Sequence, residues 1–486
     1  MVSIIITLGF WACSADEGDA IPSQRRIAHA NRLADRLTGP NAAPEYQKAV
    51  AAQVALWELA FDEQSGRRRP VFEGIDLNRL PLALTDQWRP QERSAIDAWL
   101  DANRLTLRHL QSAVRCTRCF FPVQEASGRL SASVDPVTKL IGLTRLLAIA
   151  ANRYAMDGGW LAAYAWNLRV HHMADHLYQQ PDGVSHFAAF ATERLACRQL
   201  LTFLQRHPPD DLTGLTAALR EGDELRCPGA VAAEWERLWL RDNVERWHAW
   251  AGDPAGHPDD SGLAEMMLGA DTLLGADREG IFGEPAYKSV EAFRAALNAL
   301  TVDQECLILE RLLGVYAAWD RLPFHAAWAQ VDAFEAEYCA VLREAPSLAL
   351  TGRKIPSPSR YRTSMQEARM HRTAVGAVVA ILRFQGRHHR LPDRLSELVP
   401  EFLDALPPDI YTGEALVYRV TDAGAGFTLY SIGNDRRDSG GSHTDELPGA
   451  GDLVFWPPPI PERMDLSDGA EPAQGGDAPI PQRINP

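Results

Sequence analysis

Residues 135–178 read DPVTKLIGLTRLLAIAANRYAMDGGWLAAYAWNLRVHHMADHLY, and this stretch indicates the fold class of the chain. Asp135-Pro136 is a typical helix start, because proline is well tolerated at the first helical position. The apolar residues that follow recur at spacings of three and four, which places them on one helix face. They are Leu140, Leu143, Leu147, Ala150 and Tyr154. Asp157-Gly158-Gly159 permits a tight turn into a second helix, Trp160 to about Tyr178, so we predict a helical hairpin.

Similar patterns, with almost no strand-like alternation, continue through residues 22–350 and predict one large helical domain. A third helix, Phe187 to Gln205, ends before Pro208-Pro209 and is expected to pack antiparallel to the second. Later helices are expected at about Val231–Trp250, Val290–Leu300 and Gln304–Ala345, the last with a break near Pro323. Repeated helical hairpins resemble an α-solenoid in architecture, although the fixed repeat of such proteins is missing.

The full chain has 486 residues, of which 46% are hydrophobic, so it can form two or three domains with a full-sized core. Its formal net charge is -15. Proteins that bind the phosphate backbone need clustered Lys and Arg on one face, so nucleic acid is not an expected partner.

The first residues predict export. Ile4 to Ala12 is an apolar run too short to span a bilayer but suited to the core of a signal peptide. Ala12 before Cys13 resembles a lipoprotein cleavage site, with Cys13 as the lipidated residue and residues 1–21 as the signal region. A plain signal peptide, a truncated anchor and an ordinary cytosolic terminus remain alternatives, because Phe10 and Trp11 are bulky and no basic residue precedes the run.

A small α+β module is predicted at residues 369–456, after a linker at 351–368. Its long helix runs from Arg369 to Gln385 and is closed by Gly386, where a left-handed cap is easiest. A short helix begins at Leu391-Pro392. Three short strands follow and would form an antiparallel meander that covers the long helix. They are Ala415–Val420, Phe427–Ile432 and Leu453–Trp456. Residues 457–486 are rich in Pro, Gly and Asp, so we assign them to a disordered tail.

The order of motifs in this module resembles the globular head of type II secretion major pseudopilins. The resemblance rests on a series of short motifs that follow the long helix and Gly386. They are Leu391-Pro392, Leu395 to Leu398, Leu406 to Asp409, Tyr411 to Gly413, Tyr418, the run FTLYSIGND ending at Asp435, and Gly451 to Leu453. The whole chain resembles uncharacterised exported helical proteins of planctomycete-like bacteria that carry such a module. In pseudopilins the corresponding loop binds calcium, which implies Asp435 and Asp452 as ligands here, with Asp438 close enough to contribute.

Two further patterns carry candidate chemistry. His172 and His176 are four residues apart on one helix face and could coordinate one transition-metal ion, although the HExxH motif is missing. Cys116 and Cys119 form a CxxC that has no second CxxC to complete a zinc site, so structural thiols or an export-dependent disulfide are the expected reading.

We therefore expect a mainly α, non-enzymatic scaffold or protein-interaction protein of a bacterial cell envelope, exported to the periplasm or held by a lipid anchor. Protein partners are expected, and calcium is the only expected cofactor. The alternative is a metal-dependent envelope hydrolase that uses the cluster from His171 to His176.

Overall fold

The computed structural model describes residues 23–54, 59–62, 67–70, 90–122, 134–220, 226–255, 289–352, 358–421, 426–442 and 451–458. The expected signal region, Cys13 and residues 459–486 lie outside the described residues. The described chain is mainly helical with a small antiparallel sheet, as the sequence predicts.

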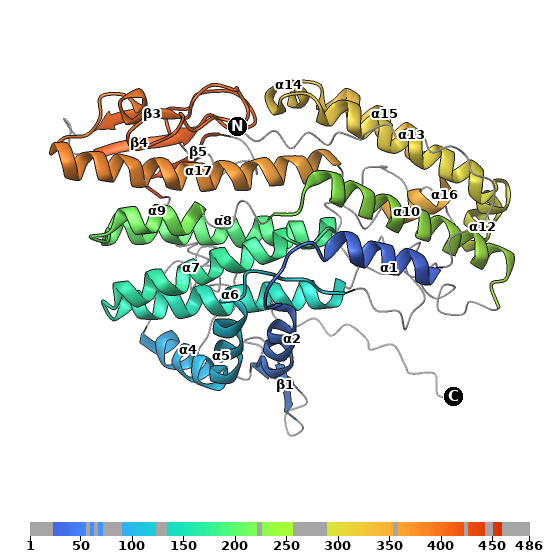
Figure 1. Cartoon of the computed structure of the whole chain (residues 1–486), viewed down its shortest axis with the longest axis horizontal. Helices are drawn as coiled ribbons and strands as arrows, with labels where there is room; N and C mark the ends of the chain where they lie inside the picture. The colour runs from blue at the N-terminus through green and yellow to red at the C-terminus, as the bar shows by residue number, and fades with distance from the viewer. Residues whose placement is uncertain are drawn as a thin grey trace, which may run out of the picture.

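A stack of long antiparallel helices forms the centre of the molecule (Figure 1). It consists of α6 (Val134–Met156), α7 (Trp160–Tyr178), α8 (Gly183–Arg206) and α17 (Pro358–His388). Each helix packs against the next in that order. The predicted hairpin is confirmed, and α7 has the predicted bounds. Helix α8 begins before Phe187, because Asp182 caps it by accepting a hydrogen bond from the Ser185 amide.

Shorter elements lie beyond α6, on the side away from α7 (Figure 1). They are α2 (Ala43–Ala52), α4 (Pro90–Ala102), α5 (Arg104–Ala113) and a hairpin of β1 (Leu59–Asp62) with β2 (Arg67–Pro70). Helix α2 packs on α5 and α6. The expectation of a purely helical region is wrong at β1 and β2, which pair antiparallel from Leu59–Pro70 to Asp62–Arg67.

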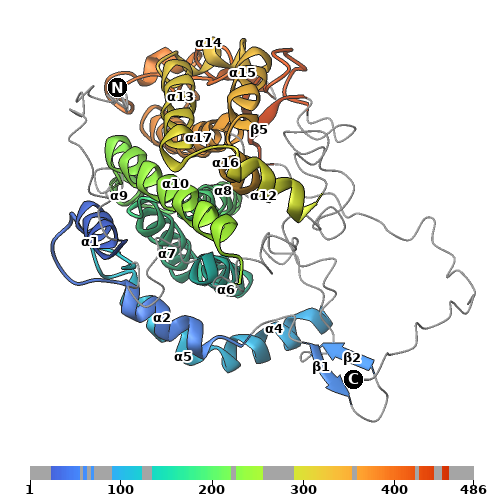
Figure 2. The ribbon, with the colours of Figure 1, turned by 90° about the vertical axis from the view of Figure 1, so that its right-hand side faces the viewer.

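A second group of helices packs around α10 (Gly229–Gly252), as Figure 2 shows. The contacting helices are α1 (Ser23–Ala34), α12 (Val290–Asn298), α13 (Val302–Asp320) and α16 (Pro346–Gly352). Helices α14 (Phe324–Trp328) and α15 (Val331–Arg343) follow the predicted break near Pro323. Helix α9 (Leu212–Arg220) lies against α7 and α17.

The C-terminal sheet has the predicted three strands in the order β3-β4-β5. Strand β3 (Val417–Thr421) pairs antiparallel with β4 (Gly426–Ser431), and β4 with β5 (Leu453–Trp456). Strand β5 packs on both α17 and α8. A 3₁₀ helix, η5 (Leu395–Leu398), forms part of the predicted short helix.

Helix α17 differs from its prediction at both ends. It begins at Pro358, so residues 358–368 of the expected linker are helical, and Arg362 is buried there. Arg362 donates to the carbonyl oxygen of Trp319 at 2.9 Å, so contacts with α13 extend the helix beyond what its sequence pattern indicates. At the other end the helix passes through Gly386, and His389 takes the left-handed conformation with φ of 57°.

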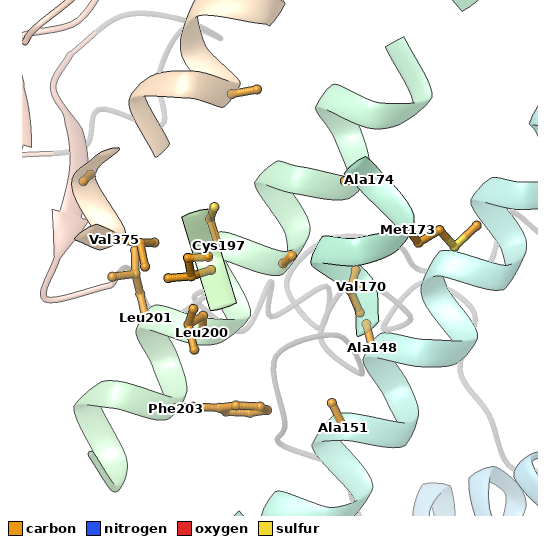
Figure 3. Close-up of a cluster of buried hydrophobic side chains, with 14 of the residues drawn as sticks. Ala148, Ala151, Val170, Met173, Ala174, Cys197, Leu200, Leu201, Phe203 and Val375 are labelled. Atoms are coloured by element: carbon orange, nitrogen blue, oxygen red, sulfur yellow. The ribbon is translucent and has the colours of Figure 1, made fainter. Parts of the chain in front are cut away.

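One hydrophobic core joins the helical region to the C-terminal module. It runs from Tyr46 on α2 through the central helices to Leu429 and Phe455 of the sheet. Figure 3 shows part of it, with side chains of α6, α7 and α8 on one side and Val375 of α17 facing Leu201. The module therefore shares its buried surface with the large helical region.

Candidate functional site

Glu193 is the centre of a buried network of charged side chains between α7, α8 and α17. It is 0% exposed. Its carboxylate accepts hydrogen bonds from the Tyr178 hydroxyl and, at 3.0 Å, from Nη2 of Arg226. Nε of Arg372 lies 2.6 Å from the same carboxylate in an ion pair. Two cations and one hydroxyl thus compensate the buried negative charge, as burial of a carboxylate requires.

Arg372 extends this network from α17 to α7. Its Nη2 donates to Oδ1 of Asp175 at 2.9 Å. Burial raises the pKa of Asp175, and the neighbouring Arg372 charge opposes that rise. The Arg226 guanidinium also lies over the Tyr178 ring, 4.0 Å from its centroid. Arg372 therefore ties α17 to α7 and α8 through two carboxylates.

A second group of titratable side chains lies at the start of α8. Oε1 of Glu236, on α10, accepts a hydrogen bond from the Gly183 amide at 3.0 Å. Burial raises the pKa of Glu236 to about 7, so its protonation changes near neutral pH. Nδ1 of His186 is hydrogen bonded to the Tyr361 hydroxyl, and Nε2 lies 2.7 Å from the carbonyl oxygen of Gln180. Side chains with shifted pKa values can take part in proton transfer. Glu236 and His186, however, are each hydrogen bonded to a neighbouring segment of the protein.

His176 is held by protein on both ring nitrogens. Nε2 lies 2.8 Å from the carbonyl oxygen of Cys116, which can only accept, so Nε2 carries the hydrogen and donates it. Nδ1 of this neutral ring then accepts from the Tyr46 hydroxyl at 2.9 Å. Burial lowers the pKa of His176 to about 4. A metal ion at either nitrogen would have to displace one of these partners.

The rest of the predicted histidine cluster divides between surface and core. His172 is half-buried, whereas His171 is buried beside Asp175 and Arg372. Burial lowers the pKa of His171, and its two ring nitrogens have no hydrogen-bond partner within the described part of the chain. No group of three or more His, Cys, Asp or Glu side chains able to hold a metal occurs among the described residues.

The three aspartates of the predicted calcium loop all face protein donors. The Asp438 carboxylate accepts from Nη2 of Arg419 at 2.6 Å and from the Tyr430 hydroxyl at 2.9 Å. Asp452 is buried and accepts backbone hydrogen bonds at 3.2 and 2.6 Å, and Asp435 does so at 3.0 and 3.3 Å. The Arg419 cation opposes a second cation at Asp438. A carboxylate offers about four lone-pair positions, so the backbone contacts of Asp435 and Asp452 do not exclude Ca²⁺, and calcium at this loop stays a prediction.

Glu193, Arg226 and Arg372 were not identified from the sequence as members of a buried network. The available signal was the presence of charged residues, Asp175, Glu193 and Arg372, within apolar helices. Such residues are rarely buried unless paired, which indicates that they meet one another in the core.

No helix within the described residues combines the length and the apolar character needed to cross a bilayer. No protein-family model matches the chain, and neither a curated protein nor a solved structure matches it.

Proposed function

We propose that this chain is a non-enzymatic scaffold of a bacterial cell envelope that binds other proteins through surfaces held in a fixed relative arrangement. The proposal includes export, with or without lipidation at Cys13, and a pseudopilin-like role for the C-terminal module as a recognition unit.

The observation that carries this proposal is the position of α17 between two parts of the molecule. One face of the helix packs on α8, and β5 of the small sheet packs on both helices. Buried residues of α17, such as Val375 and Val378, belong to the same core as Leu200 of α8 and Leu429 of β4. A shared core fixes the sheet relative to the helices, which suits a protein that presents several surfaces at once.

Additional contacts hold the sheet side to the second helical group. Nη2 of Arg436 donates to the carbonyl oxygen of His325 at 2.6 Å. The Tyr411 ring packs edge-on against Phe324 and Trp328 of α14, with centroid distances of 5.8 Å. The loops at the sheet are therefore anchored on both α17 and α14.

The charged residues of the core support a structural role as well. Glu193 and Asp175 are neutralised by Arg226 and Arg372. The hydrolase alternative would use His172 and His176, but Tyr46 and Cys116 already bind both nitrogens of His176. No observation on the described residues favours that alternative.

The test is affinity purification of the tagged full chain from envelope fractions under mild extraction after chemical crosslinking. The proposal expects a defined partner in constant stoichiometry, recovered by reciprocal tagging of that partner and lost with the tag alone. Recovery of the chain only as a free monomer would contradict it.

Metal analysis of the same preparations tests the hydrolase alternative. That alternative expects stoichiometric zinc, manganese or iron that is lost in His172→Ala and retained in a His388→Ala control, because His388 is exposed at the end of α17. Our proposal expects no such metal in the wild type.

A further inference from the structure

The loop that contains the CxxC is bound to the end of α7. After α5 ends, the Cys116 amide donates to the carbonyl oxygen of Ala113 at 3.0 Å, and the chain bends at Thr117. Nε2 of His176 donates to the Cys116 carbonyl oxygen at 2.8 Å. The Cys119 amide donates to Oε1 of Gln179 at 2.6 Å. Both cysteines are thus held by their backbones against one turn of α7.

Further hydrogen bonds fix this backbone without using either thiol. Nε2 of Gln179 donates to the Thr117 carbonyl oxygen at 3.1 Å, and Nε2 of Gln180 to that of Cys119 at 2.8 Å. Asn41 accepts from the Phe120 amide and donates to its carbonyl oxygen, both at 2.9 Å. The loop shape is therefore set by α7 and Asn41, and the thiols can change their covalent state while the backbone contacts persist.

The two thiols also lie near each other. Burial and the Cys116 charge both raise the pKa of the Cys119 thiol, and burial and the charges of both cysteines raise the pKa of the Tyr46 hydroxyl. With two residues between them and both backbones held at the end of α7, Cys116 and Cys119 are placed for a local disulfide. Both cysteines are free thiols in the structure.

The two thiols differ in access. Cys119 is buried, with 3% of its surface exposed, whereas Cys116 is only partly buried. Sγ of Cys116 makes one weak contact, 3.7 Å from the carbonyl oxygen of Ser112. Rotation of this side chain away from Ser112 breaks no strong interaction, so Cys116 is the thiol that an external reagent can reach and that can turn toward Cys119.

From these contacts we infer that Cys116 and Cys119 are a dithiol–disulfide pair that a low-molecular-weight disulfide oxidises through Cys116. The Cys116 thiolate attacks the external disulfide, which forms a mixed disulfide and releases one thiol. The Cys119 thiolate then attacks Sγ of Cys116 and releases the second thiol. The two protein thiols lose two electrons and two protons, and the external disulfide gains both as two thiols.

The surroundings of the two thiols should make thiol–disulfide exchange slow at neutral pH. Burial raises the pKa of the Cys119 thiol, and burial together with the Glu45 carboxylate raises that of Cys116. Because the thiolate is the nucleophile, exchange at neutral pH is slow and accelerates about tenfold per pH unit below the thiol pKa.

The experiment treats the reduced full chain with oxidised glutathione between pH 7 and pH 9, followed by acid quenching, alkylation and peptide mass mapping. The wild type is expected to give a Cys116–Cys119 disulfide at a rate that rises with pH. Cys306 is partly buried and has no neighbouring CxxC partner, so Cys306→Ser should form the same product.

Single variants test the assigned order of attack. Cys119→Ser should accumulate glutathione on Cys116, whereas Cys116→Ser should leave Cys119 unmodified. Circular dichroism confirms that each variant is folded. A wild type that stays reduced at every pH, that stops at glutathionylated Cys116, or that links either residue to another cysteine would overturn the inference. Modification of Cys119 in the Cys116→Ser variant would equally contradict the assigned order.

Discussion

At the residue scale, Glu193 is a buried charge on which two arginine side chains converge. The Glu193→Gln substitution keeps the shape but removes the charge that Arg226 and Arg372 share. Breaking a buried ion pair by neutralising one partner typically costs about 3–5 kcal/mol. We expect a loss of this size in the free energy of unfolding, measured by urea titration.

The matched control is Glu344→Gln, since Glu344 pairs with Arg311 at 2.7 Å on the surface, where both side chains are about half exposed. Little change in stability is expected there. Equal effects at Glu193 and Glu344 would show that the buried network does not hold α8 and α17 together.

Buried histidines predict a loss of stability on mild acidification. Burial lowers the pKa of His176 to about 4 and that of His371 to about 3. In the unfolded chain both bind a proton below about pH 6.5, so the unfolded state holds more protons between that pH and the folded pKa. Stability therefore falls as the pH drops from 6.5 toward 4, by on the order of 3 kcal/mol for His176. Unfolding midpoints across this range measure the slope.

Two variants should change that slope in opposite directions. His371→Leu removes one histidine and should flatten it. Glu236 acts the other way, because its pKa is raised to about 7 and the folded state binds the extra proton below that pH. Glu236→Gln should therefore steepen the loss on acidification. If stability depended on pH in both variants as it does in the wild type, the pKa shifts assigned to His371 and Glu236 would be contradicted.

His176 illustrates how far sequence reasoning reaches at this scale. The spacing of His172 and His176 predicts that both lie on one stretch of α7, and they do. The partners that decide the role of His176 are Tyr46 and Cys116, which are distant in sequence and carry no local signal. A helical pattern identifies a face of a helix, but it does not identify what packs on that face.

At the element scale, helix α17 shows why boundaries are harder to predict than elements. The spacing of its apolar residues predicts a core face with Ala374, Val378, Ile381 and Leu382; the first three are buried, and Leu382 is half-buried at the edge of the core. Its start was missed because residues 358–368 are rich in polar residues, and tertiary contacts such as Arg362 with Asp320 stabilise the helix there. The hairpin of β1 and β2 is too short to give a clear alternation.

The C-terminal turn of α17 gives a test of the corrected boundary. Gly386 is helical, and a Cβ placed there would meet no atom within 4 Å. Glycine in a helix is destabilising by roughly 0.5–1 kcal/mol relative to alanine, so Gly386→Ala should raise stability by about that amount. Had Gly386 been the left-handed cap, the same change would destabilise. Thermal unfolding distinguishes the two.

Gly433→Ala is the control of opposite sign. Gly433 has φ of 76°, and its added Cβ would lie 2.2 Å from the carbonyl oxygen of Gly451. A clear loss of stability is expected, because both the backbone conformation and the space exclude a side chain.

At the scale of the whole molecule, the C-terminal module shares one hydrophobic core with the helical region. The sequence separates a helical domain from a small α+β unit by composition, and the secondary structure of each part follows its local pattern. The face of α8 that receives α17 gives no separate signal, since a buried helix is apolar on several faces. The sequence identifies Leu200 and Leu201 as core residues, but it does not indicate that they pack near Val375 of α17 (Figure 3).

This shared core predicts that the central helices and the sheet unfold together. Global opening should then limit amide hydrogen exchange equally in α8, α17 and β4, so the free energies obtained from exchange mass spectrometry should agree. Val375→Ala removes packing at the junction and should lower all three by the same amount. Leu161→Ala should lower none of them, because Leu161 is 88% exposed on α7. Faster exchange confined to β4 in the Val375 variant would mean that the sheet opens by itself, and the module would then be a separable unit attached to the helices.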